Sequence, residues 1–447
     1  MPTARLLGQW ITPYLQRRVI VVMLLGFASG LPLLLSFGTL SAWLREAEIE
    51  RTAIGVFSLV GLPYALKPLW APFMDGLRIP FLTPLLGRRR GWMVATQAML
   101  MLAIGGLAFT DPGRAPWLMA AFAILVAFFS ASQDIVIDAY RIETLEDEEQ
   151  GVGAAAVTYG YRGGMLVAGA GALILADQWT WTHAYLAMAA LVLVGTVTIL
   201  VSPEPPPPVV APEDGQKEPK GWVDWLKTYV LAPFTEFTTR PGWLLILLFI
   251  ITFKLGDAFL SIMTNPFYID LGFTKTEIAE VTKLFGVIAL GLGLFVGGLL
   301  IQKVGLLNAL LITGILQAVS NFVFAYQALV GNDLAVLTVT IAVENITGGM
   351  GTAAFVAYLS SLTNTAFTAT QYALLSAFMA LGRTLLSSPS GWLVDLVGWF
   401  DFFVVSVAIA GPGLAVLLLL IRKFPNHVGR RKTLVTTQEI TEDANKA

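Results

Sequence analysis

Charged side chains interrupt several apolar stretches of this sequence, at positions where lipid would otherwise surround them. A charge at mid-bilayer costs about 3 kcal/mol on insertion scales, so such residues normally face a cavity or an oppositely charged partner. Carboxylates there can carry protons, and cationic groups can bind anions. The residues concerned are Lys67, Asp134, Asp138, Arg162, Lys254, Asp257, Glu344 and Arg383.

Asp134 and Asp138 lie four residues apart in SASQDIVIDAY and therefore share one face of a helix. Two carboxylates close together in a low dielectric hold protons more tightly, which suits a carrier that takes up and releases a proton in each cycle. Asp134 lies deepest in its apolar run, so we expect it to be the first proton carrier, with Asp138, Asp257 and Glu344 behind it. The alternative is that both aspartates merely form salt bridges to Arg162.

A second group of polar residues predicts a site for an anionic ligand. A guanidinium group grips a carboxylate with two parallel hydrogen bonds, and Arg162 and Arg383 occupy matching places in the two halves of the chain. Paired with Asp134 and Glu344, however, the two arginines would have only a structural role. Lys254 and Asp257, three apart in FKLGDAF, either neutralise each other or take part in coupling. The predicted ligand-binding residues are Lys67, Gln133, Arg162, Lys254 and Arg383.

Asp75 precedes a loop that closes with Arg88, Arg89 and Arg90. An acid at the end of one helix and a basic cluster at the start of the next can latch the helices in one conformational state and release them in another. Anchoring of the basic loop on the inner side of the membrane explains the arginines equally simply. The chain has no cysteine and two histidines, so we expect no metal and no cofactor.

These residues need membrane-spanning helices to position them. Of the 447 residues, 56% are hydrophobic and 13% are charged, which excludes an ordinary soluble domain. Apolar runs of roughly 20 residues, long enough to span a bilayer, fall at 19–42, 52–75, 91–110, 116–140, 151–176, 182–202, 241–268, 276–301, 305–329, 334–362, 366–391 and 396–421. The predicted fold class is an all-α integral membrane protein with twelve transmembrane helices in two six-helix halves.

Most Lys and Arg residues fall on one side of these spans, which predicts that both termini are cytoplasmic. We expect an N-terminal half at 1–202, a linker at 203–240, a C-terminal half at 241–422 and a cytoplasmic tail at 423–447. The linker opens with PEPPPP and continues as GWVDWLKTYVLAPF, either an amphipathic helix on the inner membrane surface or a plain loop.

Short matches between the halves indicate an internal duplication. Gly160-Tyr161-Arg162 in the fifth span resembles Leu381-Gly382-Arg383 in the eleventh, and Ala139-Tyr140 resembles Ala357-Tyr358. Such repeats fit two six-helix bundles that rock around a site near the membrane midplane. The small-residue pairs Gly26 and Gly30, Gly160 and Gly164, and Gly293 and Gly297 predict close helix packing.

The segments GFASGLPLLL, GRRRGW, SASQDIVIDAY, KLGDAF, ENITGGMGTAAFVAY and FTATQYALLSA together resemble the AmpG-type muropeptide permeases of the major facilitator superfamily. The match runs in order from about residue 26 to 392 and touches both halves. The family's acidic motif in the fourth span falls on Asp134 and Asp138, and its seventh-span motif falls on Lys254 and Asp257.

The resemblance implies proton-driven import of N-acetylglucosaminyl-anhydro-N-acetylmuramyl peptides across the bacterial inner membrane, by a protein that acts as a monomer. The expected partners are this substrate, protons and the lipid bilayer, with no nucleic acid. Longer family members carry further hydrophobic segments, which leaves the substrate range open. The alternatives are a carrier of another large anion such as acetyl-CoA, a membrane-embedded enzyme, or a sensor of cell-wall fragments.

Overall fold

The computed structural model describes residues 12–49, 58–206, 221–274, 277–278, 280–387 and 389–424. These residues form helices and turns, without strands. The predicted tail at 423–447 lies almost wholly outside the described residues, as does the part of the linker from 207 to 220.

The N-terminal half contains six spans, several of them built from more than one helix. The first is α2 (Arg17–Ser36) with α3 (Gly38–Glu46), preceded by the short η1 (Thr12–Leu15). The others are η2 to α6 (Ser58–Gly61, Leu62–Leu66, Lys67–Leu69 and Ala71–Gly76), α8 (Arg88–Ala108), α9 (Pro116–Thr144), α10 to α11 (Gln150–Leu166, Val167–Gly171 and Ala172–Gln178), and α12 with α13 (Trp181–Leu191 and Leu193–Leu200).

The C-terminal half repeats this plan. Its spans are α16 with α17 (Trp243–Thr252 and Leu255–Asp270), η7 with α19 (Glu280–Phe285 and Gly286–Val304), α20 (Leu306–Val330), α21 (Leu334–Ser361), α22 (Thr368–Ser387) and α23 (Ser390–Lys423). Nine helical stretches within the described ranges are long and apolar enough to cross a membrane by length and composition. The stretches at 58–76, 150–178 and 368–387 are largely helical as well, at the places of three further predicted spans.

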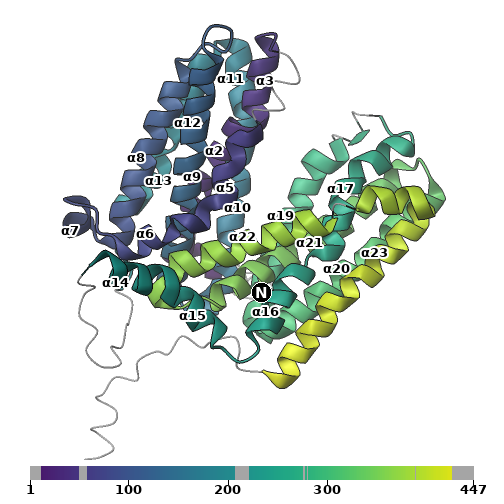
Figure 1. Ribbon diagram of the computed structural model, residues 1–447. Coiled ribbons are helices and arrows are strands. Elements are labelled where there is room, and N and C mark those ends of the chain that lie inside the picture. The colour runs from purple at the N-terminus through teal and green to yellow at the C-terminus, as the bar shows by residue number, and fades with distance from the viewer. Residues whose placement is uncertain are drawn as a thin grey trace, which may run out of the picture.

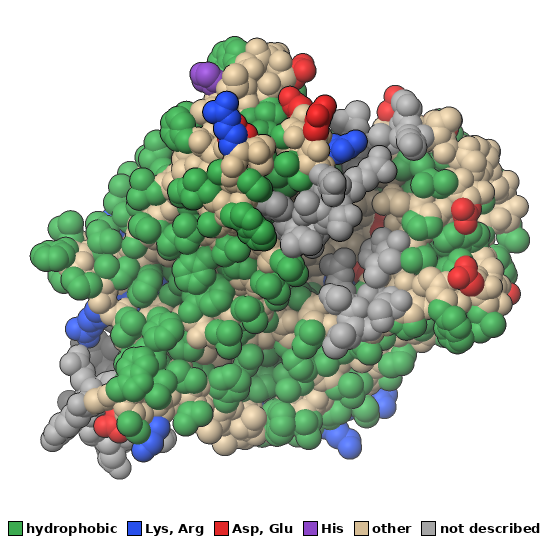
Figure 2. Space-filling model, turned by 45° about the horizontal axis from the view of Figure 1, so that its top comes forward, with side chains coloured by type: hydrophobic (Ala, Val, Ile, Leu, Met, Phe, Trp, Pro, Cys, Tyr) green, Lys and Arg blue, Asp and Glu red, His purple; other side chains and the backbone are tan. Residues whose placement is uncertain are grey.

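Apolar side chains cover the flanks of the molecule, and charged side chains gather towards its ends (Figure 2). Exposed Leu, Ile, Val and Phe residues occur on almost every long helix. In water such a surface would be unstable, whereas lipid tails solvate it at no cost. The surface therefore has the character of a multi-pass membrane protein.

Close backbone packing holds α2 against α10, as the glycine pairs predicted. A Cβ added at Gly26 would collide with the carbonyl of Val157, and one added at Gly160 would collide with the carbonyl of Met23. Gly293 plays the same part between α19 and α21, where a Cβ would collide with the carbonyl of Ile346. Small residues let these backbones touch, so each pair of helices forms a tightly packed unit.

The two halves form a V that is closed at one end and splayed at the other (Figure 1). At the closed end, hydroxyl groups bond to backbone carbonyls across the halves: Tyr14 Oη donates to Phe295 O at 2.9 Å, and Tyr159 Oη donates to Gly291 O. The helices α10 and α19 therefore pack against each other near the base of the V.

The linker forms helical turns beneath this closed end, from α14 (Trp222–Leu226) through η6 (Lys227–Leu231) to α15 (Ala232–Thr238) (Figure 1). Trp225 is buried, because its ring stacks on Phe73 and its Nε1 donates to Gly76 O at 3.4 Å. Part of the apolar face that the sequence assigned to the membrane surface thus packs against the N-terminal half. Trp222 and Val223 remain exposed.

Candidate functional site

Two carboxylates of α9 lie on the inner side of the N-terminal half. Asp134 and Asp138 both keep partial exposure, although most of their neighbours on α9 are buried. Asp134 Oδ1 accepts a hydrogen bond of 2.5 Å from Ser29 Oγ of α2. Asp138 Oδ1 lies 3.5 Å from Arg141 Nη2, one turn further along the same helix. A membrane-buried acid that retains exposure faces the space between the halves rather than lipid.

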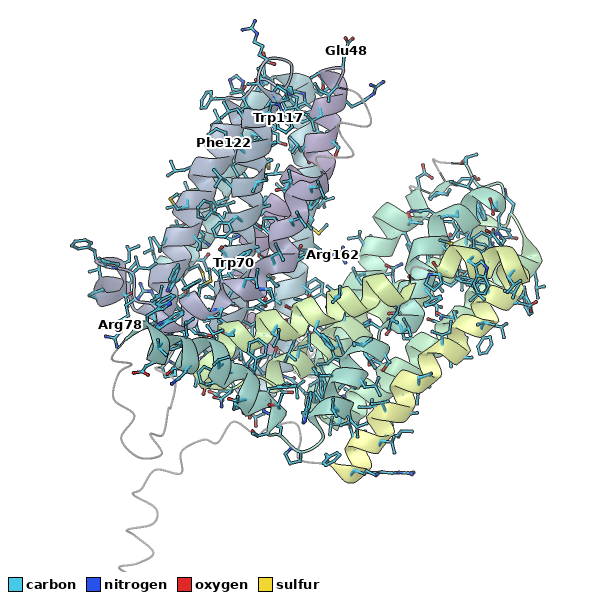
Figure 3. All side chains as sticks on the ribbon, in the orientation of Figure 1. Glu48, Trp70, Arg78, Trp117, Phe122 and Arg162 are labelled. Carbon is cyan, nitrogen blue, oxygen red and sulfur yellow. The ribbon has the colours of Figure 1, made fainter. Side chains whose placement is uncertain are left out.

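Two cations of the N-terminal half, Lys67 and Arg162, have no ion pair with any described residue. Lys67, in the broken second span, is half-buried and acts electrostatically on both Asp134 and Asp138. Arg162 of α10 is exposed and projects into the space between the two bundles (Figure 3). The salt bridge between Arg162 and Asp134 considered above does not form, because Ser29 takes the place of the arginine at Asp134.

Gln133 points in another direction from Asp134. Its side chain is fully buried, and Nε2 donates to Ala28 O of α2 at 2.9 Å. Its Oε1 is buried without a hydrogen-bond partner in the described structure. In this conformation Gln133 therefore links α9 to α2, away from the space between the halves.

The C-terminal half carries a second charged cluster. Lys254 Nζ lies 3.1 Å from Asp257 Oδ2 and donates to Gln317 Oε1 of α20 at 3.2 Å, and Gln317 Nε2 in turn donates to Asp257 Oδ2. Gly351 of α21 makes room for this arrangement, since an added Cβ would lie 2.6 Å from Gln317 Oε1. Glu344 of α21 is half-buried and feels the charges of both Asp257 and Lys254. Lysine and carboxylate thus neutralise each other here, as one of the two sequence interpretations had it.

Arg383 belongs to α22, a helix that packs against both α9 and α17. Its side chain lies outside the described part of the chain, so its pairing with Glu344 is untested.

At the closed end, Asp75 joins the two halves. Its side chain is fully buried, with Oδ1 2.7 Å from Arg89 Nη2. Its Oδ2 accepts hydrogen bonds from the backbone N and the Oγ1 of Thr370 at 2.8 and 2.7 Å, at the start of α22. A carboxylate at a helix N-terminus satisfies free N–H groups and the helix dipole. Asp75 of the N-terminal half therefore caps a helix of the other half.

The three arginines beside Asp75 have different partners. Arg89 is buried and binds Glu143 of α9 through Nη2 at 2.5 Å and through Nε at 2.9 Å. Arg88 reaches Asp75 O at 3.1 Å and Glu143 at 3.4 Å. Arg90 instead donates to the last carbonyls of α13, including Leu200 O at 2.8 Å. Only Arg88 and Arg89 belong to the network around Asp75.

Sequence reasoning missed several members of these clusters. Ser29, Gln317 and Thr370 are uncharged, so the free-energy cost of burying a charge in the membrane does not single them out. Glu143 and Arg141 carry charge but stand at the end of a span, where a solvated position is the ordinary expectation. Groups of His, Asp and Glu that could hold a metal ion are absent from the described residues.

Comparisons with known proteins agree with this architecture. A family model described as the Major Facilitator Superfamily matches residues 22–274 and 254–442. The anhydromuropeptide permease of Escherichia coli strain K12 is 44% identical over 413 residues, which are 92% of this chain and 81% of the relative. Putative transporter AmpG 4 of Rickettsia felis is 36% identical over 406 residues, covering 91% of this chain and 97% of the relative.

Solved structures show the same fold at low sequence identity. The Escherichia coli fucose:proton symporter FucP has a TM-score of 0.64 at 15% identity, covering 93% of this chain and 98% of that one. The proton:xylose symporter XylE, bound to 6-bromo-6-deoxy-D-glucose, has a TM-score of 0.57 at 13% identity, covering 93% and 96%. The fold and the charges between its halves define a multi-pass membrane transporter rather than an enzyme. The chain belongs to the major facilitator superfamily and, within it, to the AmpG family of permeases.

Proposed function

We propose that this chain imports anhydromuropeptides into the cytoplasm, driven by protons and by alternating access. The observation that supports the proposal is that each half carries acids and cations on its membrane helices, in a chain 44% identical to a protein named anhydromuropeptide permease. Buried charge is costly, and a transporter of an anionic amphiphile that uses protons requires both kinds of group.

The substrate carboxylates bind to cations that the protein leaves without a counter-ion. Arg162 and Lys67 are the leading candidates, because neither forms an ion pair within the described chain. Arg383 completes the set from the opposite half. Lys254 and Gln133 are each engaged within the protein in this state, so they contribute only if their hydrogen bonds change during the cycle.

Proton coupling centres on Asp134. Ser29 and Lys67 favour its ionised form, whereas burial away from water favours its neutral form. Substrate bound to Lys67 neutralises the lysine charge that favours the ionised form of Asp134. Substrate binding therefore favours protonation of Asp134, and protonation favours substrate binding, as symport requires. Asp138, Asp257 and Glu344 are the further acids that exchange protons along the path.

The network of Asp75, Arg88 and Arg89 acts as the conformational latch, with Arg90 fixing the adjacent helix end. Asp75 holds the N-terminus of α22 in the state described, in which the other end of the molecule is open. Opening of the closed end requires Asp75 to leave Thr370, and the positive charge of Arg89 remains to stabilise it within its own half.

The closed end faces the cytoplasm of a bacterium, with both termini inside and the protein acting as a monomer in the inner membrane. In this topology the halves at 1–202 and 241–422 cross the membrane, and the linker 203–240 that joins them lies on the cytoplasmic side. Because the chain has no cysteine, single cysteines report on it directly. Arg78→Cys at the closed end is expected to react with an impermeant thiol reagent only from inside, and Arg114→Cys at the open end only from outside. The reverse pattern contradicts the topology.

The function itself is tested by uptake of purified anhydromuropeptide into proteoliposomes. An inward proton gradient is expected to raise the internal substrate concentration above the external one. Collapsing the gradient with a protonophore is expected to leave only equilibration. Absence of uptake in both conditions refutes the substrate, and uptake that ignores the gradient refutes the coupling.

A further inference from the structure

Arg141 is a buried charge whose hydrogen-bonding capacity is largely unused. It lies in the last turn of α9, and its side chain has no exposed surface. Neither Nε nor Nη1 has a hydrogen-bond partner, and Nη2 reaches only Asp138 Oδ1, at 3.5 Å. A buried polar group without a partner costs about 1–3 kcal/mol, and more when it is charged. In this conformation the partners of Arg141 are the Asp138 carboxylate and the Tyr372 ring, and most of its N–H groups have no acceptor.

Arg89, at the same end of the molecule, shows that burial alone does not impose this cost. Its guanidinium group is equally buried, yet it contacts Asp75, Glu143 and the carbonyl of Met74 at 2.5–3.1 Å. The fold thus supplies an acceptor for every guanidinium nitrogen of Arg89 and leaves the three N–H donors on Nε and Nη1 of Arg141 without any. Arg141 is consequently the guanidinium with spare capacity for a ligand.

The cover over Arg141 comes from the other half of the protein. The ring of Tyr372 in α22 lies with its centroid 5.4 Å from the guanidinium carbon. The N-terminus of α22 is also the segment that Asp75 caps. Release of that cap allows α22 to move away from α9, and Tyr372 then uncovers the free N–H groups of Arg141 on the wall of the newly opened space.

Arg141 also continues the row of cations along the N-terminal half. Asp138 interacts with both Lys67 and Arg141, so it stands between the cation deeper in the membrane and the cation at the closed end. A carboxylate that leaves Lys67 towards the cytoplasm therefore meets Arg141 next.

We propose that Arg141 is a second carboxylate-binding subsite for the substrate, covered by Tyr372 in this state and open only when the cytoplasmic end opens. This inference rests on the proposed function. The ligand is a carboxylate of the transported peptide, and the subsite acts on release into the cytoplasm and on binding from that side.

The experiment compares the apparent KM at each face of the membrane. Inside-out vesicles present the cytoplasmic face, and right-side-out vesicles present the other. Arg141→Met is expected to raise the KM for anhydromuropeptide at the cytoplasmic face about ten-fold, as expected for a lost charged hydrogen bond, and to leave the KM at the other face unchanged. An analogue with amidated carboxyl groups is expected to show no shift at either face.

Equal shifts at the two faces, an equal shift for the amidated analogue, or no shift overturns the proposal. If Arg141→Met does not reach the membrane, Arg141→Lys retains the charge but loses the fork, and the same sidedness is expected with a smaller shift. Failure of the parent protein to transport anhydromuropeptide refutes the proposed function. If the parent and Arg141→Met both transport it, and the variant has the parent's KM at each face, the subsite alone is refuted.

Discussion

The two charged clusters inside the membrane belong to different halves of the chain, and they hold their cations differently. In the C-terminal half, Lys254 is held by Asp257 and Gln317 within 3.2 Å. In the N-terminal half, Asp134 is held by the neutral Ser29, and Lys67 has no ion pair among the described residues. The partner that binds each acid therefore decides which half has cations free for a ligand.

The largest effect is expected at Asp134. Asp134→Asn imitates the protonated form, so the variant is expected to exchange substrate across the membrane but not to accumulate it. One charge moving through 100 mV supplies about 2.3 kcal/mol, which corresponds to roughly fifty-fold accumulation. The measurement is the ratio of internal to external substrate under a proton gradient.

Asp111→Asn, in an exposed loop, serves as the matched control and is expected to accumulate substrate normally. If Asp134→Asn concentrates substrate as well as the parent does, coupling does not depend on the N-terminal cluster. Loss of accumulation in Glu344→Gln alone would then assign coupling to the C-terminal half.

The next effect separates the two lysines. Lys67→Met is expected to weaken binding of a carboxylate substrate about ten-fold, because one charged contact is lost. Lys254→Met is expected to change affinity less and thermal stability more, because it leaves Asp257 and Gln317 without their cation. Equilibrium binding and thermal unfolding in detergent measure the two quantities.

The double variant Lys254→Met with Asp257→Leu removes both charges and is expected to recover part of the lost stability. A greater loss of affinity in Lys254→Met than in Lys67→Met shows instead that the C-terminal half supplies the cation for the ligand.

A smaller effect is expected at Asp75, which belongs to one half and caps a helix of the other. Asp75→Asn keeps the shape but loses the charge, which weakens its hydrogen bonds by about 1 kcal/mol. A cysteine at the buried position Ala373 in α22 is then expected to react with a thiol reagent about five times faster. Glu146→Gln, exposed at the same end, is the control. An unchanged rate shows that the halves are held together without this cap.

The smallest effect is expected for Arg162→Lys, which keeps the charge and loses the bidentate fork. Binding of a carboxylate substrate is expected to fall two- to three-fold, with no change for a neutral disaccharide analogue. Titration of both ligands against the purified protein measures the difference. Equal losses for the two ligands argue against direct recognition of a carboxylate by Arg162.

Hydropathy predicted the twelve helical stretches within a few residues, because lipid imposes one length and one composition on every span. The sequence predicted the side-chain pairings between spans less well. The sequence offered Arg162 as a partner for Asp134, but the partner is Ser29, whose hydroxyl has no signature in a charge count. The sequence does not single out Arg141 either, since only tertiary packing shows that Tyr372 covers it.

The helices around the closed end make two kinds of packing contact. At Gly26 and Gly160 the backbones of α2 and α10 touch, so neither helix can slide along the other without a steric clash. Between α19 and the N-terminal half, two tyrosine hydroxyls bond to carbonyls of Gly291 and Phe295, one helical turn apart, beside close packing of Gly298 against Gly151. Every turn of α19 presents another carbonyl of the same kind, so a displacement of about 5.4 Å returns each hydroxyl to an equivalent acceptor. The hydrogen bonds of the second contact can therefore re-form after a shift of one turn, whereas the first contact leaves no room for one.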